Sequence, residues 1–326
     1  MNTRAYMLAA GLALATLPFA ATAQTVWDVS LPWGPNEFHT LNAQAFAEAV
    51  EEATDGEVRM VIHPAGALGV RANESLRAVE DGAVPMAEYA LFQNVGELPL
   101  LGIEAIPFLI NDYDDLRRMH ALVRPVWEEQ LARRNQIALY IVPWPSQNFF
   151  TKEPVEVIED FDGVRMRVYD ANTSTMVSRL GMTPQQMNNP DIVPALATGR
   201  LDAVMTSGTT AVAQNYWEFL NHTYTTNHLW ASNVMAVNME AWEELSADHR
   251  QVIRDLAREM EPGFWDISAA EHETRMAQLI ENGMTVSAPS ADLIGQMKAA
   301  TADMADEFGA AVPDAAPVIA AFRSGN

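Results

Sequence analysis

The feature that most constrains the fold is an alternation of strand-like and helix-like segments that runs along the chain twice. The strand-like segments of the first run are 26–33, 57–64, 85–92 and 137–144, and those of the second run are 164–168, 183–187 and 201–207. Amphipathic segments with helical spacing lie between them, the longest at 113–135. This alternation predicts mostly parallel sheets with helices on their faces. Because the rhythm starts again near residue 164, we expect two α/β lobes.

A third kind of segment, residues 245–283, keeps helical periodicity for many turns after a capping Ser246. At about 1.5 Å per residue it is too long for one lobe. We therefore expect a long helix that spans both lobes. Pro262 and Gly263 are expected to kink or break it.

The N-terminus has the pattern of an export signal. Arg4 precedes an uncharged apolar run, and Ala21-Thr22-Ala23 fits a signal peptidase site. We expect residues 1–23 to be a signal peptide and the mature chain to start near Gln24. The alternative is an N-terminal membrane anchor, for which the apolar run is short.

Charge and cysteine content narrow the possible partners. The chain has 43 Asp and Glu but only 20 Lys and Arg, a net charge of −23, which argues against a nucleic-acid partner. There is no cysteine, so the fold must be stable without disulfides.

Motifs for catalysis or cofactor binding are missing from the sequence. The seven histidines are scattered without an HExxH spacing, so no metal site is expected. No GxGxxG, GxxxxGK[ST] or GxSxG motif occurs, so no cofactor is expected and nothing points to an enzyme.

Several aromatic residues lie at or just after the ends of expected strands, at the edge where open α/β sheets bind ligands. They are Trp33, Trp144, Phe149, Phe150 and Trp230. Core packing and ligand contact are about equally good explanations for this group.

Two arginines stand on one side of the strand in "FDGVRMRVYDANT" (161–173). Side chains alternate along a strand, so Arg165 and Arg167 face one way and Met166 the other. One explanation is a solvated strand whose arginines pair with surface acids. The other is an anion clamp, because a guanidinium matches the planar fork of a carboxylate.

The segment from Glu159 to Ser207 contains a series of short motifs: Asp162-Gly163, Arg167-Val168, Leu180-Gly181, Met187, Ala195-Leu196, Gly199 and Leu201-Asp202-Ala203. With these motifs the segment resembles the signature region of the solute-binding proteins of tripartite ATP-independent (TRAP) transporters, of the DctP type. Upstream "HPAGALG", "LRAVEDGAV" and "IPFLI", and downstream "TTNHLWASN" and "NMEAWEELSADHRQVI", extend it over most of residues 25–310.

The resemblance implies a two-lobed periplasmic-binding-protein architecture that closes on an organic acid. It places the carboxylate-binding arginine at Arg167, with Arg165 as its helper or a surface neighbour. Sialic-acid-binding members have a second arginine where this chain has Gln147, and "QEN" where it has Val204-Met205-Thr206, so sialic acid is not the expected ligand. The expected ligand-binding residues are Arg167, Glu88, Gln147, Trp33, Phe149, Asn188, Thr206 and Trp230.

We therefore expect a periplasmic receptor that binds a small carboxylate between its lobes and delivers it to a TRAP membrane permease. Lobe I would comprise residues 24–145 and 233–272, and lobe II residues 146–232 and 273–326. An alternative ligand is an ammonium compound or zwitterion, bound by Glu88 with Trp33, Trp144 and Trp230. A periplasmic enzyme on the same fold is the alternative of a different class.

Overall fold

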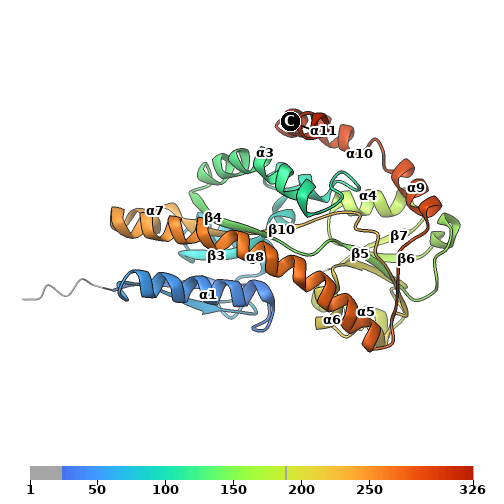
Figure 1. Ribbon diagram of the computed structural model, residues 1–326, viewed down its shortest axis with the longest axis horizontal. Coiled ribbons are helices and arrows are strands. Elements are labelled where there is room, and N and C mark those ends of the chain that lie inside the picture. The colour runs from blue at the N-terminus through green and yellow to red at the C-terminus, as the bar shows by residue number, and fades with distance from the viewer. Residues whose placement is uncertain (1–23, 188, 326) are drawn as a thin grey trace, which may run out of the picture.

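The computed structural model describes residues 24–187 and 189–325, which form two β-sheets flanked by helices (Figure 1). The expected signal peptide and Asn188 lie outside the described residues. Each sheet forms the centre of one α/β lobe, as the double alternation in the sequence predicts.

The first sheet has five strands in the order β2-β1-β3-β10-β4. Strand β1 pairs in parallel with β2 and β3, whereas β10 runs antiparallel to β3 and β4. The strands are β1 (Thr25–Ser30), β2 (Val58–His63), β3 (Met86–Ala90), β4 (Gln136–Pro143) and β10 (Ser232–Asn238).

The second sheet has six strands in the order β11-β9-β5-β8-β6-β7. Strands β7, β6 and β8 are parallel neighbours, and β5 runs antiparallel to β8 and β9. The strands are β5 (Asn148–Thr151), β6 (Arg165–Val168), β7 (Thr183–Gln186), β8 (Ala203–Thr206), β9 (His222–Tyr224) and β11 (Thr285–Ser287).

Both sheets are more mixed than the alternation predicts. The antiparallel strands β5 and β10 each enter their sheet directly from the other lobe, without a helical crossover. Parallel neighbours require such a crossover, so a strand that arrives without one can run antiparallel.

Helices cover the faces of both sheets. The α-helices are α1 (Phe38–Ala53), α2 (Ser75–Glu80), α3 (Tyr113–Ala132), α4 (Ala171–Arg179), α5 (Ile192–Ala197), α6 (Gly208–Ala213), α7 (Met239–Glu243), α8 (Ala247–Glu281), α9 (Ala291–Ala300), α10 (Met304–Ala311) and α11 (Ala315–Ser324). Short 3-10 helices are η1 (Ala72–Glu74), η2 (Leu91–Asn94), η3 (Pro99–Ala105), η4 (Ile158–Phe161), η5 (Asn189–Asp191) and η6 (Tyr216–Glu218).

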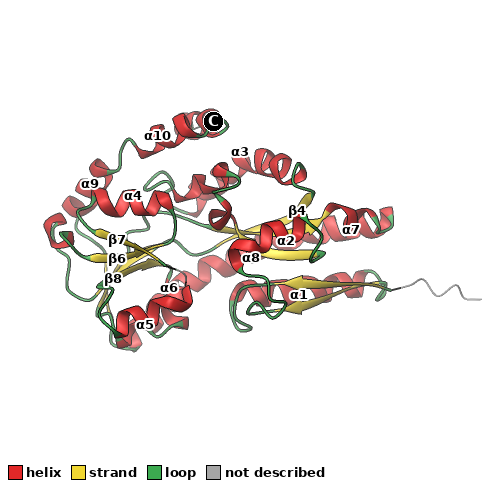
Figure 2. Ribbon diagram, turned by 180° about the vertical axis from the view of Figure 1, so that it is seen from behind, coloured by secondary structure: helices red, strands yellow, loops and turns green. Residues whose placement is uncertain are grey.

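The long helix α8 connects the lobes, as expected from its length. It packs on β4 and α1 in the first lobe and on α6 and β11 in the second (Figure 2). Its 35 residues correspond to about 52 Å. The helix continues on both sides of Pro262, so the break that the sequence allowed there is absent, and Ser246 caps the helix by accepting from the His249 N–H.

Two further connections run side by side between the sheets. The Trp144 N–H donates to the Ala231 carbonyl over 2.8 Å, and the Gln147 N–H donates to the Leu229 carbonyl over 3.0 Å. The two connections therefore form a paired, two-stranded junction.

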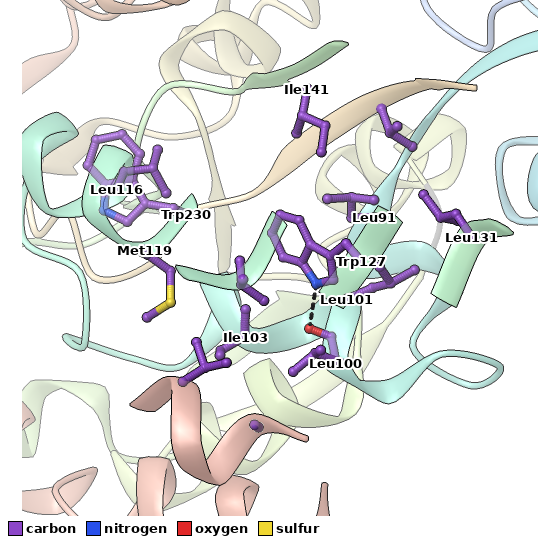
Figure 3. Packing of buried hydrophobic residues seen from close by; sticks show 14 of the residues in the cluster. Leu91, Leu100, Leu101, Ile103, Leu116, Met119, Trp127, Leu131, Ile141 and Trp230 are labelled. Carbon is purple, nitrogen blue, oxygen red and sulfur yellow. Dashed lines mark hydrogen bonds between the residues drawn. The ribbon is translucent and has the colours of Figure 1, made fainter. Parts of the chain in front are cut away.

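The core of the first lobe is built around Trp127 of α3 (Figure 3). Its indole N–H donates to the Leu100 carbonyl over 3.2 Å, so the ring is buried without an unpaired polar atom. Helix α11 packs against α3 and buries Val318 and Phe322 in the same cluster. The C-terminal helix is thereby held on the first lobe.

Candidate functional site

The two arginines of β6 have different environments. Arg165, half exposed at the start of the strand, forms a bidentate ion pair with Asp202, with N–O distances of 2.7 and 2.6 Å. Arg167, near the carboxyl end, is only 7% exposed. The alternation rule correctly places both on one side of the strand, but only Arg167 is enclosed.

Arg167 has no carboxylate partner among the residues that the structure describes. Its Nε donates to the Met187 carbonyl over 3.2 Å and one terminal nitrogen to the Met205 carbonyl over 3.3 Å. Burial lowers the pKa of the guanidinium from its usual value. A buried, unpaired cation is costly, so this position is suited to an anionic ligand.

Further polar groups surround Arg167 and lack hydrogen-bond partners in the described chain. They include the hydroxyls of Tyr169 and Tyr216 and one carboxylate oxygen of Asp170. The guanidinium lies 5.3 Å from the Tyr169 ring centre. Burial raises the pKa of both tyrosines and of Asp170, so the tyrosines are hydrogen-bond donors at neutral pH. Sequence reasoning missed these three residues, although Tyr169 and Asp170 directly follow β6.

The strand register determines which residues share a face with Arg167. Arg167 pairs with Val204, so Thr206, two residues further along β8, lies on the same face near its carboxyl end. Asn148 is the partner of Thr206 on β5 and lies on this face too. Thr206 was expected in the site, whereas Asn148 was not.

Phe149 and Trp230, which were expected to contact the ligand, lie in the hydrophobic core. Phe149 pairs with Met205, on the opposite face from Arg167, and its ring stacks on His228 at 4.3 Å. Trp230 is in the core of the first lobe beside Leu116 (Figure 3), and its indole N–H donates to the Ile110 carbonyl over 3.1 Å. A position at the end of a strand does not determine which face a side chain takes.

Glu88 is the central polar residue of the first lobe and is only 1% exposed. Its Oε1 accepts from Asn233 Nδ2 over 2.8 Å and lies 2.8 Å from His39 Nδ1. Its Oε2 has no hydrogen-bond partner among the described residues. One buried acceptor is thus available, and His39 and Asn233 are neighbours that sequence reasoning missed.

Trp33 belongs to an aromatic cluster next to Glu88. Its ring meets Trp144 edge-on at 5.0 Å, and Trp144 packs on His39 at 4.3 Å. The Trp144 indole N–H donates to Asn233 Oδ1 over 2.8 Å, whereas the Trp33 indole N–H has no partner within the described ranges. Trp33 therefore offers a buried donor.

The two lobes touch beside Arg167. Phe92, which follows β3, packs on Tyr169 with 4.7 Å between ring centres. Gln147 is buried in the paired connection and donates to the Pro145 carbonyl over 3.1 Å. The carboxyl ends of β3 and β6 therefore meet, as expected for a ligand site in an open α/β fold.

The described residues were also compared with the requirements of a metal site and of a membrane-spanning helix. No group of three or more His, Asp or Glu residues among them has the geometry to hold a metal ion. No helix among them is long and apolar enough to cross a membrane.

Two α/β lobes joined by paired connections, with an unpaired arginine buried at their junction, define the class of two-lobed solute receptors. Residues 29–311 match the family described as bacterial extracellular solute-binding protein, family 7 (DctP). The chain belongs to this family.

Solved structures and curated proteins are similar along most of the chain. A TRAP solute-binding protein from a marine metagenome, specific for pyroglutamate, is 31% identical with a TM-score of 0.86 and aligns over 92% of this chain and 99% of its own. DctP7 of Bordetella pertussis, a receptor binding pyroglutamic acid, is 27% identical with a TM-score of 0.87 over the same shares. The C4-dicarboxylate-binding periplasmic protein DctP of Rhodobacter capsulatus is 24% identical over 74% of each chain.

Proposed function

We propose that this receptor binds one small organic acid at the junction of its lobes, with Arg167 pairing the carboxylate. The observation that carries the proposal is the buried guanidinium, whose hydrogen bonds within the described chain go only to backbone carbonyls. A ligand carboxylate would supply the missing charge through planar, charge-assisted hydrogen bonds. Tyr169 and Tyr216 have hydroxyls available as additional donors.

We infer that the ligand also carries an N–H group, and pyroglutamate is the first candidate. Glu88 Oε2 is a buried acceptor without a partner among the described residues, and a ring N–H would satisfy it. Two similar receptors, at 31% and 27% identity, have pyroglutamate as their ligand. Both observations support a carboxylic acid that also carries an N–H group.

A zwitterion with an ammonium group is the second candidate. Glu88 is an acidic residue beside the aromatic rings of Trp33 and Trp144, and such rings attract cations. An ammonium group would pair with Glu88 while its carboxylate pairs with Arg167. Trp230, which the sequence suggested for such a cage, is in the core and is left out of this proposal.

The cellular role that we propose is delivery of this acid, in the periplasm, to a TRAP membrane permease, without catalysis. Residues 1–23 would be removed on export. We retain lobes of residues 24–145 with 233–272 and 146–232 with 273–326, except that α11 packs on the first lobe. Gln147 and Asn188 remain proposed contacts on the basis of the family resemblance.

Calorimetric titration of the mature protein with pyroglutamate, succinate and glycine betaine tests the ligand class. We expect pyroglutamate to bind tightly, succinate weakly and betaine not at all. Tight binding of betaine would instead favour a site dominated by Glu88 and the aromatic rings. If none of the three binds, and a wider screen of organic acids gives no thermal shift, the proposal is wrong.

A further inference from the structure

A cavity of about 690 Å³ lies against the outer edge of the first sheet, between α3, α8 and the edge strand β4. Figure 1 shows α3 and α8 on either side of β4. We call this cavity the β4 groove. It shares no residue with the candidate site around Arg167.

The edge of β4 is only partly covered. Strand β4 pairs with β10 on its inner side. At Ile141, side chains of α8 take the place of a neighbouring strand: Glu261 accepts from its N–H over 3.2 Å, and the Trp265 indole N–H donates to its carbonyl over 2.8 Å. Nearer the start of the strand, Ile137, Ala138 and Leu139 line the groove instead. An uncovered sheet edge is a template for an added extended chain.

Two prolines increase the number of acceptors at the groove. Pro125 in α3 and Pro262 in α8 are both inside helices and both line the groove. Each lacks an N–H, so the carbonyls of Ala121 and Arg258 cannot receive their usual helical hydrogen bond. Ala121 and Arg258 also line the groove, and residues four apart share one face of a helix.

His120 provides a buried polar atom at the same place. It lines the groove and is only 5% exposed, and its Nδ1 has no hydrogen-bond partner in the described chain. Its Nε2 donates to the Glu104 carboxylate. Nδ1 is therefore a buried ring nitrogen whose hydrogen-bonding capacity is unused within the described residues. The two carbonyls beside it are acceptors suited to backbone N–H groups.

The charges at the groove favour an acidic occupant. Arg124 is neutralised by Glu128 and Glu261, at 2.7 and 2.6 Å. Arg254 has no ion pair among the described residues and lies over the Trp242 ring. Arg258 has only the exposed partner Asp255 at 3.1 Å. These last two arginines are exposed on one face of α8, in a chain with a net charge of −23.

We propose that the β4 groove binds an extended, acidic segment of a partner protein, which adds a strand to the uncovered edge of β4. Its N–H groups would reach the acceptors of the groove, and its carboxylates would pair with Arg254 and Arg258. A second copy of this chain fits less well, because pairing two β4 edges would bring the arginines of both copies together. The proposal is independent of solute binding at Arg167.

The test uses a fluorescent, end-blocked peptide of sequence Thr-Val-Glu-Val-Glu-Thr and the mature protein, followed by fluorescence anisotropy. We expect saturable binding that Arg254→Glu/Arg258→Glu weakens by about tenfold or more. The matched control, Arg59→Glu/Arg200→Glu, changes the net charge equally at exposed positions outside the groove and should leave binding unchanged. Ala121→Trp, or Ala132→Trp if that variant misfolds, should block the groove sterically.

The outcomes separate this proposal from solute binding. Organic-acid titrations of the groove variants should match wild type, whereas Arg167→Ala should leave peptide binding intact. The proposal is overturned if the peptide does not bind, if a version with lysines in place of its glutamates binds as tightly, or if the control weakens binding equally. Light scattering that shows a dimer sensitive to Ala121→Trp would assign the groove to a second copy instead.

Discussion

At the residue scale, Arg165 and Arg167 show how two equal side chains on one strand acquire different roles. Arg165 is at the exposed start of β6, where Asp202 neutralises it. Arg167 is two residues nearer the carboxyl end, where the lobes meet and water is largely excluded. The strength of a charge interaction depends on this local solvation, so we expect Arg167, and not Arg165, to bind an anion.

Arg167→Ala is expected to weaken binding of the organic acid by about a hundredfold or more, because the ligand carboxylate would be buried without a partner. Arg167→Lys should recover part of the affinity, since an ammonium lacks the planar fork. Calorimetric titration measures both.

Arg165→Ala is the matched control on the same strand. It removes a partly exposed ion pair, so affinity should change by less than about threefold. If Arg167→Ala binds as tightly as wild type, the assignment of the carboxylate site is wrong. If both alanine variants lose affinity equally, the two arginines act together.

His228 should make the protein less stable at acid pH. Burial lowers the pKa of its imidazole from 6.5 to about 3, and its ring stacks on Phe149 in the core. Between these pH values the unfolded chain binds a proton that the folded chain does not, so the free energy of unfolding falls as pH falls from 6.5 towards 3. The loss from this group is at most about 1.4 kcal/mol per pH unit.

Urea unfolding of wild type and His228→Gln at pH 7, 6, 5 and 4 isolates this contribution, because other titrating groups affect both proteins. The stability difference between the two should shrink as pH falls. If the free energies of unfolding of the two proteins change in parallel with pH over this range, His228 does not cause the loss of stability at acid pH.

At the element scale, glycines have opposite meanings at the end and in the middle of a helix. Gly181 follows α4 with φ +86°, and its carbonyl accepts from the Gly163 N–H over 3.0 Å. Gly295 is inside α9, with open space where a side chain would project. Gly181 is needed because its backbone is in the left-handed conformation. At Gly295 a glycine only lowers the helix propensity of α9.

Gly181→Ala should lower the free energy of unfolding by about 1–2 kcal/mol or more, because L-residues pay for this backbone conformation. The new Cβ would also lie 2.6 Å from an Asp162 oxygen, which must move. Gly295→Ala should raise the free energy of unfolding by about 0.5–1 kcal/mol. Chemical denaturation measures the free energy of unfolding of both variants and of wild type. If Gly295→Ala lowers it, glycine at this position of α9 has a structural role that the open space around it does not indicate.

At the scale of the whole molecule, we expect solute binding to be coupled to the relative position of the lobes. The lobes are connected by the paired crossover segments and α8, and Phe92 touches Tyr169 across the junction beside Arg167. A ligand that contacts both lobes favours the closed arrangement, since only a difference in affinity shifts the equilibrium.

Small-angle scattering should therefore give a smaller radius of gyration with saturating ligand than without it. Phe92→Ala should weaken ligand affinity roughly two- to tenfold, because the aromatic contact contributes only in the closed state. Phe219→Ala, a partly buried residue packed within the second lobe, is the control and should leave affinity unchanged. Equal radii with and without ligand, together with unchanged affinity of Phe92→Ala, would contradict closure.

Local chain chemistry alone determined the two-lobe α/β architecture, the long helix and the shared side of Arg165 and Arg167. Each depends on periodicity, capping and alternation between near neighbours in sequence. The family resemblance added the proposal, still to be tested, that Arg167 binds the ligand carboxylate. These features could be predicted because short-range rules apply before the chain packs.

Tertiary structure decided which candidate residues reach the site. It placed Phe149 and Trp230 in the core, gathered Tyr169, Tyr216 and Asp170 around Arg167, and brought His39 and Asn233 to Glu88. It also kept α8 continuous through Pro262. These outcomes depend on strand register and on contacts between residues far apart in sequence, so the face and the burial of each side chain follow only from packing.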